Sequence, residues 1–408
     1  MNTEAVRRIL RDVEATRSQR EDLYKFFHQH AELSMQEVIT SQKIVEELES
    51  YEIPYQRVGR TGVVAVIKNG DGAVVAFRAD IDGLPIEEAS GKEYASHAAQ
   101  VDEVTGETVK TSHACGHDFH IMSLLGALQA FNSHRSDWNG TLIGIFQPAE
   151  EIAAGARDMI DNGLGEKIPH PDVYLGQHVL ANLPGGHLGT RVGSVLSAAF
   201  SVKVELTGRG SHGSMPELSV DTVVLAANIV TRLQQIVSRE IAAAQSAVLT
   251  VGSIHAGTKS NIIPQTAELL INTRAFNQDV ANHLKEAIER VVNAECEAAR
   301  CPEPARFTYY DEYPLTSNDA EVTHRVRAAF DEYFPGETHD LDQVLASEDF
   351  SIIPSALGVP YTFWGLGGFA DPDSAPGNHN PAFAPDLQPT LDRGLEAVVV
   401  AASAWLVP

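Results

Sequence analysis

The sequence predicts an α/β protein with a mostly parallel sheet, into which a smaller α+β domain is inserted. Continuous apolar segments at 141–146 and 173–176 are typical of buried parallel strands. After residue 193 the pattern changes to alternating strands in the order β-α-β-β-α-β, which indicates a split βαβ unit of the ferredoxin-like type. The earlier pattern then resumes. We therefore predict one discontinuous domain from 1–193 and 314–408, and an inserted domain from 194–313.

Hydrophobic periodicity places the elements of the first domain. Strands are expected at 63–67, 74–77, 141–146, 173–176 and 360–364. Helices are expected over 1–30, 38–51, 121–131, 153–160, 320–333 and 391–405. The pattern Ser34-Met35-Gln36-Glu37 matches a capping box, in which Ser34 caps the second of these helices and Glu37 reaches back. An active-site role for Glu37 is the alternative.

The inserted domain contains a glycine motif that needs a separate interpretation. Its strands are expected at 199–206, 246–254, 268–276 and 306–310, and its helices over 220–237 and 280–299. The segment Gly208-Arg209-Gly210-Ser211-His212-Gly213 matches the pattern G-x-G-x-x-G of dinucleotide-binding proteins. That fold also needs an acidic residue at the end of the next strand, whereas Glu240 by pattern still continues the helix and no strand has intervened. A dinucleotide-dependent dehydrogenase is therefore disfavoured.

Composition narrows the classes of protein and partner. The 408 residues are 43% hydrophobic and 21% charged, as in globular proteins. A formal net charge of −25 argues against nucleic acid or an anionic membrane as partner, and no apolar segment approaches the about 20 residues of a membrane span. The charged, amphipathic N-terminus differs from a signal peptide. With only three cysteines, no disulfide framework is expected, and we predict a cytoplasmic protein.

The densest group of potential metal ligands lies in the segment 111–120, Thr-Ser-His-Ala-Cys-Gly-His-Asp-Phe-His. Cys115 and His117 are two positions apart on a bend and can face one centre. A borderline-soft cation such as Zn²⁺ prefers this donor set. A buried cysteine with surface histidines at a helix start is the alternative, but the number of donors favours a metal.

Further donors follow the predicted strands. Asp80, the pair Glu150 and Glu151, and His178 each come after a strand, and His379 precedes the last helix. A solvated turn or a charged helix start would explain any one of them alone. In open α/β sheets, however, ligands bind at the carboxyl ends of the strands, so the repeated placement indicates a site.

The collected donors are too many for one closed tetrahedral site and suit one or two catalytic ions with open positions. The predicted ligands are Cys115, His117, Glu151, His178 and His379. Adjacent residues in a turn point in different directions. Glu150 can therefore take a proton from a water molecule while Glu151 binds metal.

Together these motifs resemble the metal-dependent N-acyl-amino-acid amidohydrolases of the carboxypeptidase G and aminoacylase superfamily, a branch with aminoacylases, hippurate hydrolases and indole-acetyl-amino-acid hydrolases. The resemblance covers nearly the whole chain through the motifs Arg78-Ala79-Asp80-Ile81-Asp82-Gly83-Leu84-Pro85, His113-Ala114-Cys115-Gly116-His117-Asp118, Gln147-Pro148-Ala149-Glu150-Glu151, Gln177-His178 and Asn378-His379. It implies two divalent ions, Zn²⁺ or Mn²⁺, and Glu150 as general base. The implied reaction hydrolyses an N-acyl-L-amino acid to a carboxylic acid and a free amino acid. A dipeptidase or carboxypeptidase on the same scaffold is the nearest alternative, and the presence of Glu150 disfavours an inactive binding protein.

The resemblance also implies roles outside the ligand set. Asp80 would orient a ligand, His212 would stabilise the oxyanion, and Asn261 and Arg274 would hold the substrate carboxylate. The inserted domain would close over the substrate and form dimers or tetramers, and in relatives its histidine can come from the partner subunit. Many branch members have His-Ala-Ala-x-Pro-His where this chain has His212-Gly213-Ser214-Met215-Pro216-Glu217, which leaves acyl and side-chain specificity open.

Overall fold

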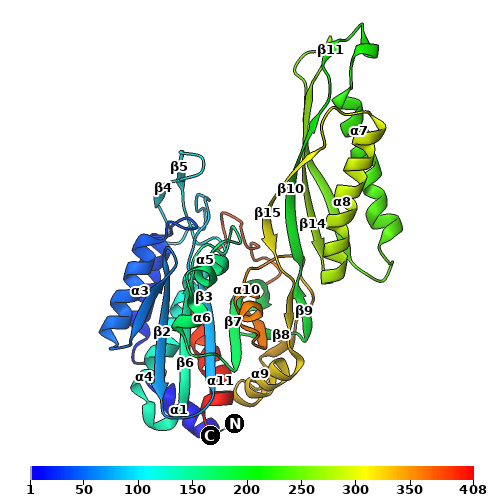
Figure 1. Cartoon of the computed structure of the whole chain (residues 1–408). Coiled ribbons are helices and arrows are strands. Elements are labelled where there is room, and N and C mark those ends of the chain that lie inside the picture. Colours follow the sequence, from blue (N-terminus) through cyan, green and yellow to red (C-terminus); the bar gives the residue numbers. More distant parts are fainter. Residues whose placement is uncertain (1) are drawn as a thin grey trace. The chain divides into compact units, whose positions relative to one another are not determined.

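The computed structural model describes residues 2–408 and divides into two compact units, which Figure 1 colours along the sequence. Unit 1 comprises Met1–Val195, Ser317–Asp342 and Asp349–Pro408, and unit 2 comprises Leu196–Thr316 and Gln343–Glu348. The short segment Gln343–Glu348 thus belongs to unit 2 and not, as the sequence pattern predicts, to the first domain. Within residues 2–408, no helix is long and apolar enough to cross a membrane.

Unit 1 is built on an eight-stranded sheet of order β1-β2-β6-β3-β7-β18-β8-β17. Its strands are β1 (Tyr55–Val58), β2 (Gly62–Asn69), β3 (Val74–Asp80), β6 (Gly140–Gln147), β7 (Val173–Pro184), β8 (Leu188–Thr190), β17 (Thr338–Asp340) and β18 (Tyr361–Phe369). The central strands β6, β3, β7 and β18 are mutually parallel, which confirms the predicted sheet. Because they are parallel, their carboxyl ends lie at one edge.

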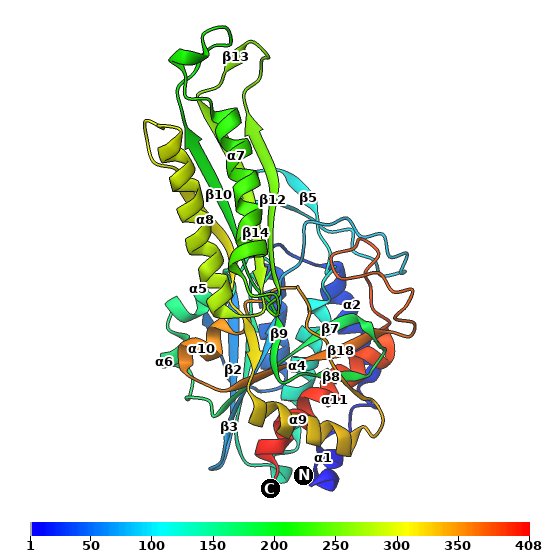
Figure 2. The same cartoon turned by 90° about the vertical axis from the view of Figure 1, so that its right-hand side faces the viewer.

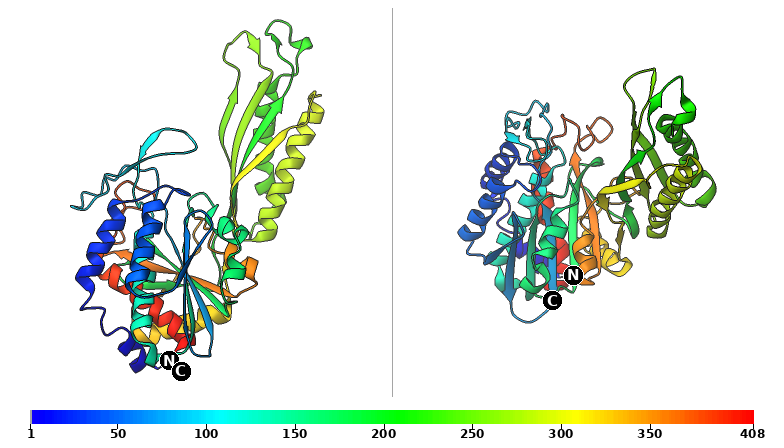
Figure 3. Two further views of the ribbon diagram at one scale, coloured as in Figure 1. Left: turned by 60° about the vertical axis from the view of Figure 1, so that its left-hand side comes forward. Right: turned by 45° about the horizontal axis from the view of Figure 1, so that its top comes forward.

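The helices of unit 1 cover this sheet. They are α1 (Thr3–Ile9), α2 (Arg17–Gln29), α3 (Val38–Ser50), α4 (His117–Ser133), η1 (Arg135–Asp137), α5 (Gly155–Asp161), α6 (Leu164–Lys167), α9 (Ala320–Tyr333), α10 (Ile352–Leu357) and α11 (Leu387–Leu406), with β4 (Ala99–Val101) and β5 (Thr108–Lys110) as a separate hairpin. The helix α4 is almost entirely buried and approaches α11 closely at Gly126, where a Cβ would lie 2.2 Å from Leu395 Cδ1. Figure 3 shows α1 beside the end of α11.

Unit 2 has the predicted ferredoxin-like architecture. Its elements are β10 (Ala198–Thr207), β11 (Ser211–His212), η2 (Pro216–Leu218), α7 (Thr222–Gln235), η3 (Ile236–Glu240), β12 (Ala247–Ala256), β13 (Ile262–Ile263), β14 (Thr266–Ala275), α8 (Gln278–Ala298) and β15 (Arg306–Tyr313). The strands β9 (Gly193–Leu196) and β16 (Thr316–Asn318) lie where the chain passes between the units. The antiparallel sheet has the order β12-β14-β10-β15, and α7 and α8 cover one of its faces (Figure 2).

The glycine motif does not form a dinucleotide cradle. The segment from Gly208 leads from β10 into β11, which pairs with β13, and then into η2 before α7 begins at Thr222. A phosphate cradle requires a strand that turns directly into a helix N-terminus. The dehydrogenase alternative therefore has no structural support.

The predicted capping box is wrong. The carboxylate of Glu32 accepts the free backbone N–H groups at the start of α3, those of Ile39 at 3.0 Å and Thr40 at 2.8 Å. A carboxylate from outside the helix therefore accepts the N–H groups that a local cap was expected to satisfy. This leaves the side chains of Ser34 and Glu37 available for contacts with other segments.

Candidate metal centre

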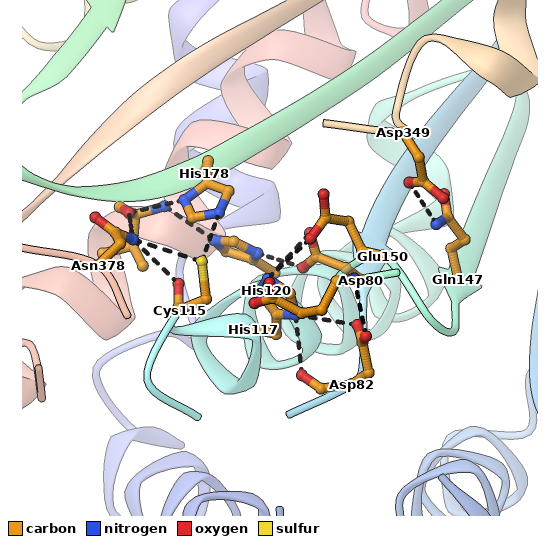
Figure 4. A network of polar contacts seen from close by, with 12 residues as sticks. Asp80, Asp82, Cys115, His117, His120, Gln147, Glu150, His178, Asp349 and Asn378 are labelled. Carbon is orange, nitrogen blue, oxygen red and sulfur yellow. Dashed lines mark hydrogen bonds and ion pairs between the residues drawn. The ribbon is translucent and has the colours of Figure 1, made fainter. Parts of the chain in front are cut away.

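The predicted donors of unit 1 meet at the carboxyl ends of the central strands. The parallel register pairs Asp80 at the end of β3 with Gln147 at the end of β6, and β7 contributes His178. The helix α4 begins at His117 beneath this edge. Figure 4 shows the side chains from these elements turned toward one another. His178 does not follow a strand, as predicted, but lies within β7, which continues to Pro184. The strand-end rule correctly placed Asp80 and Gln147 at one edge of the sheet.

The ring orientation of His117 is fixed by a hydrogen bond at Nδ1. Its Nδ1 donates to the backbone carbonyl of Asp82 at 2.9 Å, so Nε2 carries the free lone pair. This Nε2 lies 3.7 Å from Asp80 Oδ2, 3.9 Å from Glu150 Oε2 and 3.8 Å from Glu151 Oε1. Neither His117 Nε2 nor Glu151 Oε1 has a hydrogen-bond partner in the described chain, although both are buried.

His178 and Cys115 form a second close pair (Figure 4). His178 Nδ1 donates to the carbonyl of Val179 at 2.8 Å, which again directs Nε2 into the site, 3.5 Å from Cys115 Sγ. The amide of Asn378 donates to the Val179 carbonyl at 3.3 Å and lies 3.7 Å from Cys115 Sγ. Asn378 therefore fixes the thiol from the loop that precedes the last helix.

His379 joins Glu151 and Cys115. Its Nε2 is 3.3 Å from Glu151 Oε2, and one ligand atom from each of these three residues lies within 4.8 Å of the others. The backbone of His379 has a positive φ of 66° and donates its N–H to the Ala114 carbonyl at 2.8 Å. All five predicted ligands are thus part of one continuous cluster.

The electrostatics of the cluster favour positive charge. Hydrogen bonds to Cys115 and Glu151 raise the pKa of His379 to about 10. Burial, in contrast, lowers the pKa of the His178 imidazole well below its usual value, and a metal ligand must be neutral in this way. Anionic groups that raise one imidazole pKa would equally attract a divalent cation.

Asp80 is more tightly engaged than the sequence indicated. Burial would raise its pKa, but His117, His120 and Arg78 outweigh burial and hold the pKa well below the usual range. One oxygen bonds to His120 Nδ1 and the other accepts from Arg78 at 2.5 Å. His120 Nε2 accepts the Val179 N–H at 2.9 Å, so this ring fixes the backbone beside the site. Sequence reasoning had missed His120, although it lies in the donor-rich segment.

Two further carboxylates shape the loop after β6. Asp82 Oδ2 accepts the backbone N–H of Glu151 at 3.1 Å and the hydroxyl of Ser34 at 2.6 Å. The fully buried Asp349 accepts from Gln147 Nε2 at 2.7 Å (Figure 4). Asp82 lies inside the motif Arg78–Pro85, which contributes to the family resemblance, whereas no local pattern indicates a role for Asp349.

The tip of unit 2 holds His212 and Asn261 together. β11 pairs with β13 through His212 and Ile262, and Gly213 donates its N–H to the Asn261 carbonyl at 2.8 Å. His212 Nδ1 accepts the backbone N–H of Ser214 at 3.2 Å, so the neutral ring carries its proton on the exposed Nε2. That N–H is available to donate.

Arg274 lies at the opposite end of the unit 2 sheet. Its guanidinium donates to the Leu345 carbonyl at 2.5 Å and contacts Ser347 Oγ at 3.2 Å. The strand from Thr266 to Arg274 alone spans about 26 Å at roughly 3.3 Å per residue. Unit 2 of one chain therefore does not bring Arg274 and Asn261 together.

Comparison with known proteins agrees with this fold. The chain is 35% identical over 377 residues to N-acetylcysteine deacetylase of Bacillus subtilis, covering 92% of this chain and 91% of that protein. It is 33% identical over 343 residues to IAA-amino acid hydrolase ILR1-like 2 of Arabidopsis thaliana, covering 83% and 75%. The crystal structure of Bacillus subtilis YXEP protein, described as a dinuclear metal binding peptidase, has a TM-score of 0.78 and 29% identity, covering 95% and 98%.

The fold and the matched relatives define a metal-dependent amidohydrolase. The chain belongs to peptidase family M20/M25/M40, which matches residues 76–403. The predicted membership of the N-acyl-amino-acid amidohydrolase branch is confirmed by the deacetylase and hydrolase relatives.

Proposed function

We propose that this enzyme hydrolyses the amide bond of N-acyl-L-amino acids and releases a carboxylic acid and a free amino acid. The observation that carries the proposal is the pair of unsatisfied buried atoms, His117 Nε2 and Glu151 Oε1, beside Glu150. Buried polar atoms without partners are rare in proteins, and a bound cation would satisfy both. The names of the deacetylase and amino acid hydrolase relatives support this substrate class.

The residues present fit two divalent ions, Zn²⁺ or Mn²⁺. We assign as ligands Cys115, His117, Glu151, His178 and His379. Two of the imidazoles have Nδ1 fixed by a backbone carbonyl, an arrangement that is common in metal sites. When bound, the ions would polarise the acyl carbonyl and lower the pKa of water.

The chain's own residues would move the proton and hold the substrate. Glu150 takes the proton from the attacking water and passes it to the leaving amine. His212 donates from Nε2 to the oxyanion of the tetrahedral intermediate. Asp80 orients the ligand His178 through His120, whose other ring nitrogen holds the backbone N–H of Val179. Arg274 and Asn261 hold the substrate carboxylate. Arg274 supplies the local positive charge that an anionic substrate needs in this acidic protein.

A homo-oligomer, dimer or tetramer, follows from this assignment. Asn261 and Arg274 lie at opposite ends of one sheet, so they can hold one carboxylate only if two copies of unit 2 take part. We propose that unit 2 is the lid and dimerisation domain and that His212 acts on the substrate of the partner subunit. The partners are then small N-acyl amino acids, with no nucleic acid or membrane, and the location is cytoplasmic, where the Cys115 thiol stays reduced.

The test is a measurement of amino-acid release from N-acetyl, N-benzoyl and long-chain N-acyl amino acids and from simple dipeptides, with and without a chelator. Release from the acyl substrates that the chelator abolishes and Zn²⁺ or Mn²⁺ restores is expected. Glu150→Gln should keep its metal and lose about 100- to 10,000-fold in kcat. Glu166→Gln, at an exposed glutamate of unit 1, is the matched control and should match the wild type. No release at full metal occupancy would refute the proposal, and release from dipeptides alone would favour a peptidase.

A further inference from the structure

Glu37 stands at the N-cap position of α3, but its buried side chain makes no cap hydrogen bond to that helix. Oε1 accepts the backbone N–H of Ala149 at 2.8 Å and that of Met35 at 3.0 Å, while Oε2 accepts the Thr61 hydroxyl at 2.6 Å. The residue has no exposed surface. A buried carboxyl group therefore links the segment before α3 to the residue that immediately precedes Glu150.

Ala149 has a conformation that alanine does not choose by itself. Its φ is +48°, in the left-handed region that favours glycine. Its carbonyl accepts the N–H groups of Ala154 and Gly155, both at 3.1 Å, so the loop from 148 to 155 closes on this residue. The left-handed turn at the end of β6 lets the next two side chains, Glu150 and Glu151, both face His117.

We propose that Glu37 is a positioning residue for Glu150: by holding the N–H of Ala149, it keeps the loop after β6 in the left-handed turn that aims the general base. The inference rests on the proposed function for the role of Glu150. Asp82 holds the same loop two residues further on through the N–H of Glu151. Glu37 and Asp82 thus fix the backbone on either side of Glu150.

The acceptor, rather than the negative charge, is what the loop needs. Burial, together with the nearby charge of Asp82, raises the pKa of Glu37 to about 8. In either protonation state Oε1 can accept the two backbone N–H groups, and the Thr61 hydroxyl can donate to or accept from Oε2. Glutamine at position 37 offers the same carbonyl acceptor and an N–H for Thr61. Methionine has a similar length and offers neither.

The experiment compares Glu37→Met with Glu37→Gln in the metal-loaded enzyme. The methionine variant should keep its metal content and KM but lose about 10- to 100-fold in kcat, since a displacement of about 1 Å can cost on the order of 100-fold. The glutamine variant should retain the wild-type kcat. Glu32→Met is the matched control, because Glu32 is also buried and also holds two backbone N–H groups, those at the start of α3. It should lower the unfolding temperature and leave kcat unchanged.

Two further measurements separate positioning from general destabilisation. Glycine adopts positive φ at little cost, so adding Ala149→Gly to Glu37→Met should recover most of the lost kcat. Crystal structures should show Ala149 with positive φ in Glu37→Gln and with negative φ in Glu37→Met. If the methionine variant does not fold, Thr61→Val, which releases one oxygen of Glu37, should lower kcat severalfold at constant KM.

Several results would overturn the inference. These are wild-type kcat in Glu37→Met, an equal kcat loss in Glu32→Met, wild-type kcat in Thr61→Val, or an unchanged Ala149 φ in Glu37→Met. If the wild-type enzyme releases no amino acid from any acyl substrate, the proposed function fails. The crystallographic comparison of Ala149 still decides whether Glu37 holds the turn.

Discussion

The raised pKa of His28 provides a quantitative test of how buried carboxylates act on a histidine near the candidate metal centre. Its ring is buried between two carboxylates, with Nδ1 2.6 Å from Asp118 Oδ2 and Nε2 3.1 Å from Glu88 Oε1. Asp118 stands next to His117 at the start of α4, so this contact ties α2 to the helix that carries a predicted ligand. Burial lowers the pKa of His28, but the hydrogen bonds to Asp118 and Glu88 outweigh burial and raise it to about 9.

The sign and size of the effect on stability follow from linkage. The pKa is 6.5 in the unfolded chain and higher in the folded one, so the folded state binds the proton more tightly. The stabilisation is complete below pH 6.5 and is lost as the pH rises through about 9. The difference between the two pKa values corresponds to about 3 kcal/mol in the free energy of unfolding. The lowered pKa values of Asp118 and Glu88 express the same interaction and are not added.

The assay is urea unfolding of the wild type and of His28→Gln between pH 6 and pH 10, with chelator present so that metal binding does not contribute. All three tryptophans of the chain lie in unit 1, so their fluorescence reports the unit that contains His28. The free-energy difference between the two proteins should be about 3 kcal/mol larger at pH 6 than at pH 10. A difference that does not change with pH would refute the reasoning. So would a His28 imidazole that titrates near its unfolded value by NMR in the wild type.

Two other predictions concern the substrate and the catalytic loop. Arg274→Ala should raise KM about 10- to 100-fold for substrates with a free carboxylate, because a charged hydrogen bond is lost. Kinetics on amidated substrates provide the control, and an equal effect there would assign Arg274 only to the backbone of Leu345. Gly155→Ala should cost about 1–3 kcal/mol of stability and most of kcat, since the new Cβ would lie 1.5 Å from the Pro148 carbonyl oxygen. Gly252→Ala, which meets no atom within 4 Å, is the matched control in denaturation and activity assays, and equal effects of the two substitutions would contradict the prediction.

The cluster of candidate metal ligands could be predicted because its residue types and spacings are local features of the sequence. Cys115 and His117 lie on one bend, and Glu150 and Glu151 follow a strand whose apolar run marks it as buried and parallel. Parallel strands place their carboxyl ends at one edge regardless of how far apart they are in the chain. Residue type and strand direction were therefore sufficient to expect these side chains together.

The residues that support the cluster could not be found in this way. Glu37 matches a local capping pattern, but the carboxylate of Glu32 accepts the N–H groups at the helix start. Glu37 instead bonds to a residue 112 positions away. Asp349 and His120 likewise act through partners that only the folded chain brings near. A buried polar group must find a partner somewhere, yet the sequence does not specify which of many distant backbone groups it will be.

The residues of unit 2 show a third case, in which identity was predictable but geometry was not. The resemblance assigned Asn261 and Arg274 to one substrate carboxylate. Arg274 lies near the end of β14, whereas Asn261 precedes β13 beyond the start of β14, and the sheet cannot fold back to join them. If both groups bind the same carboxylate, the active site must combine two copies of the chain. A monomeric variant of the enzyme should then bind metal normally and fail on every carboxylate substrate.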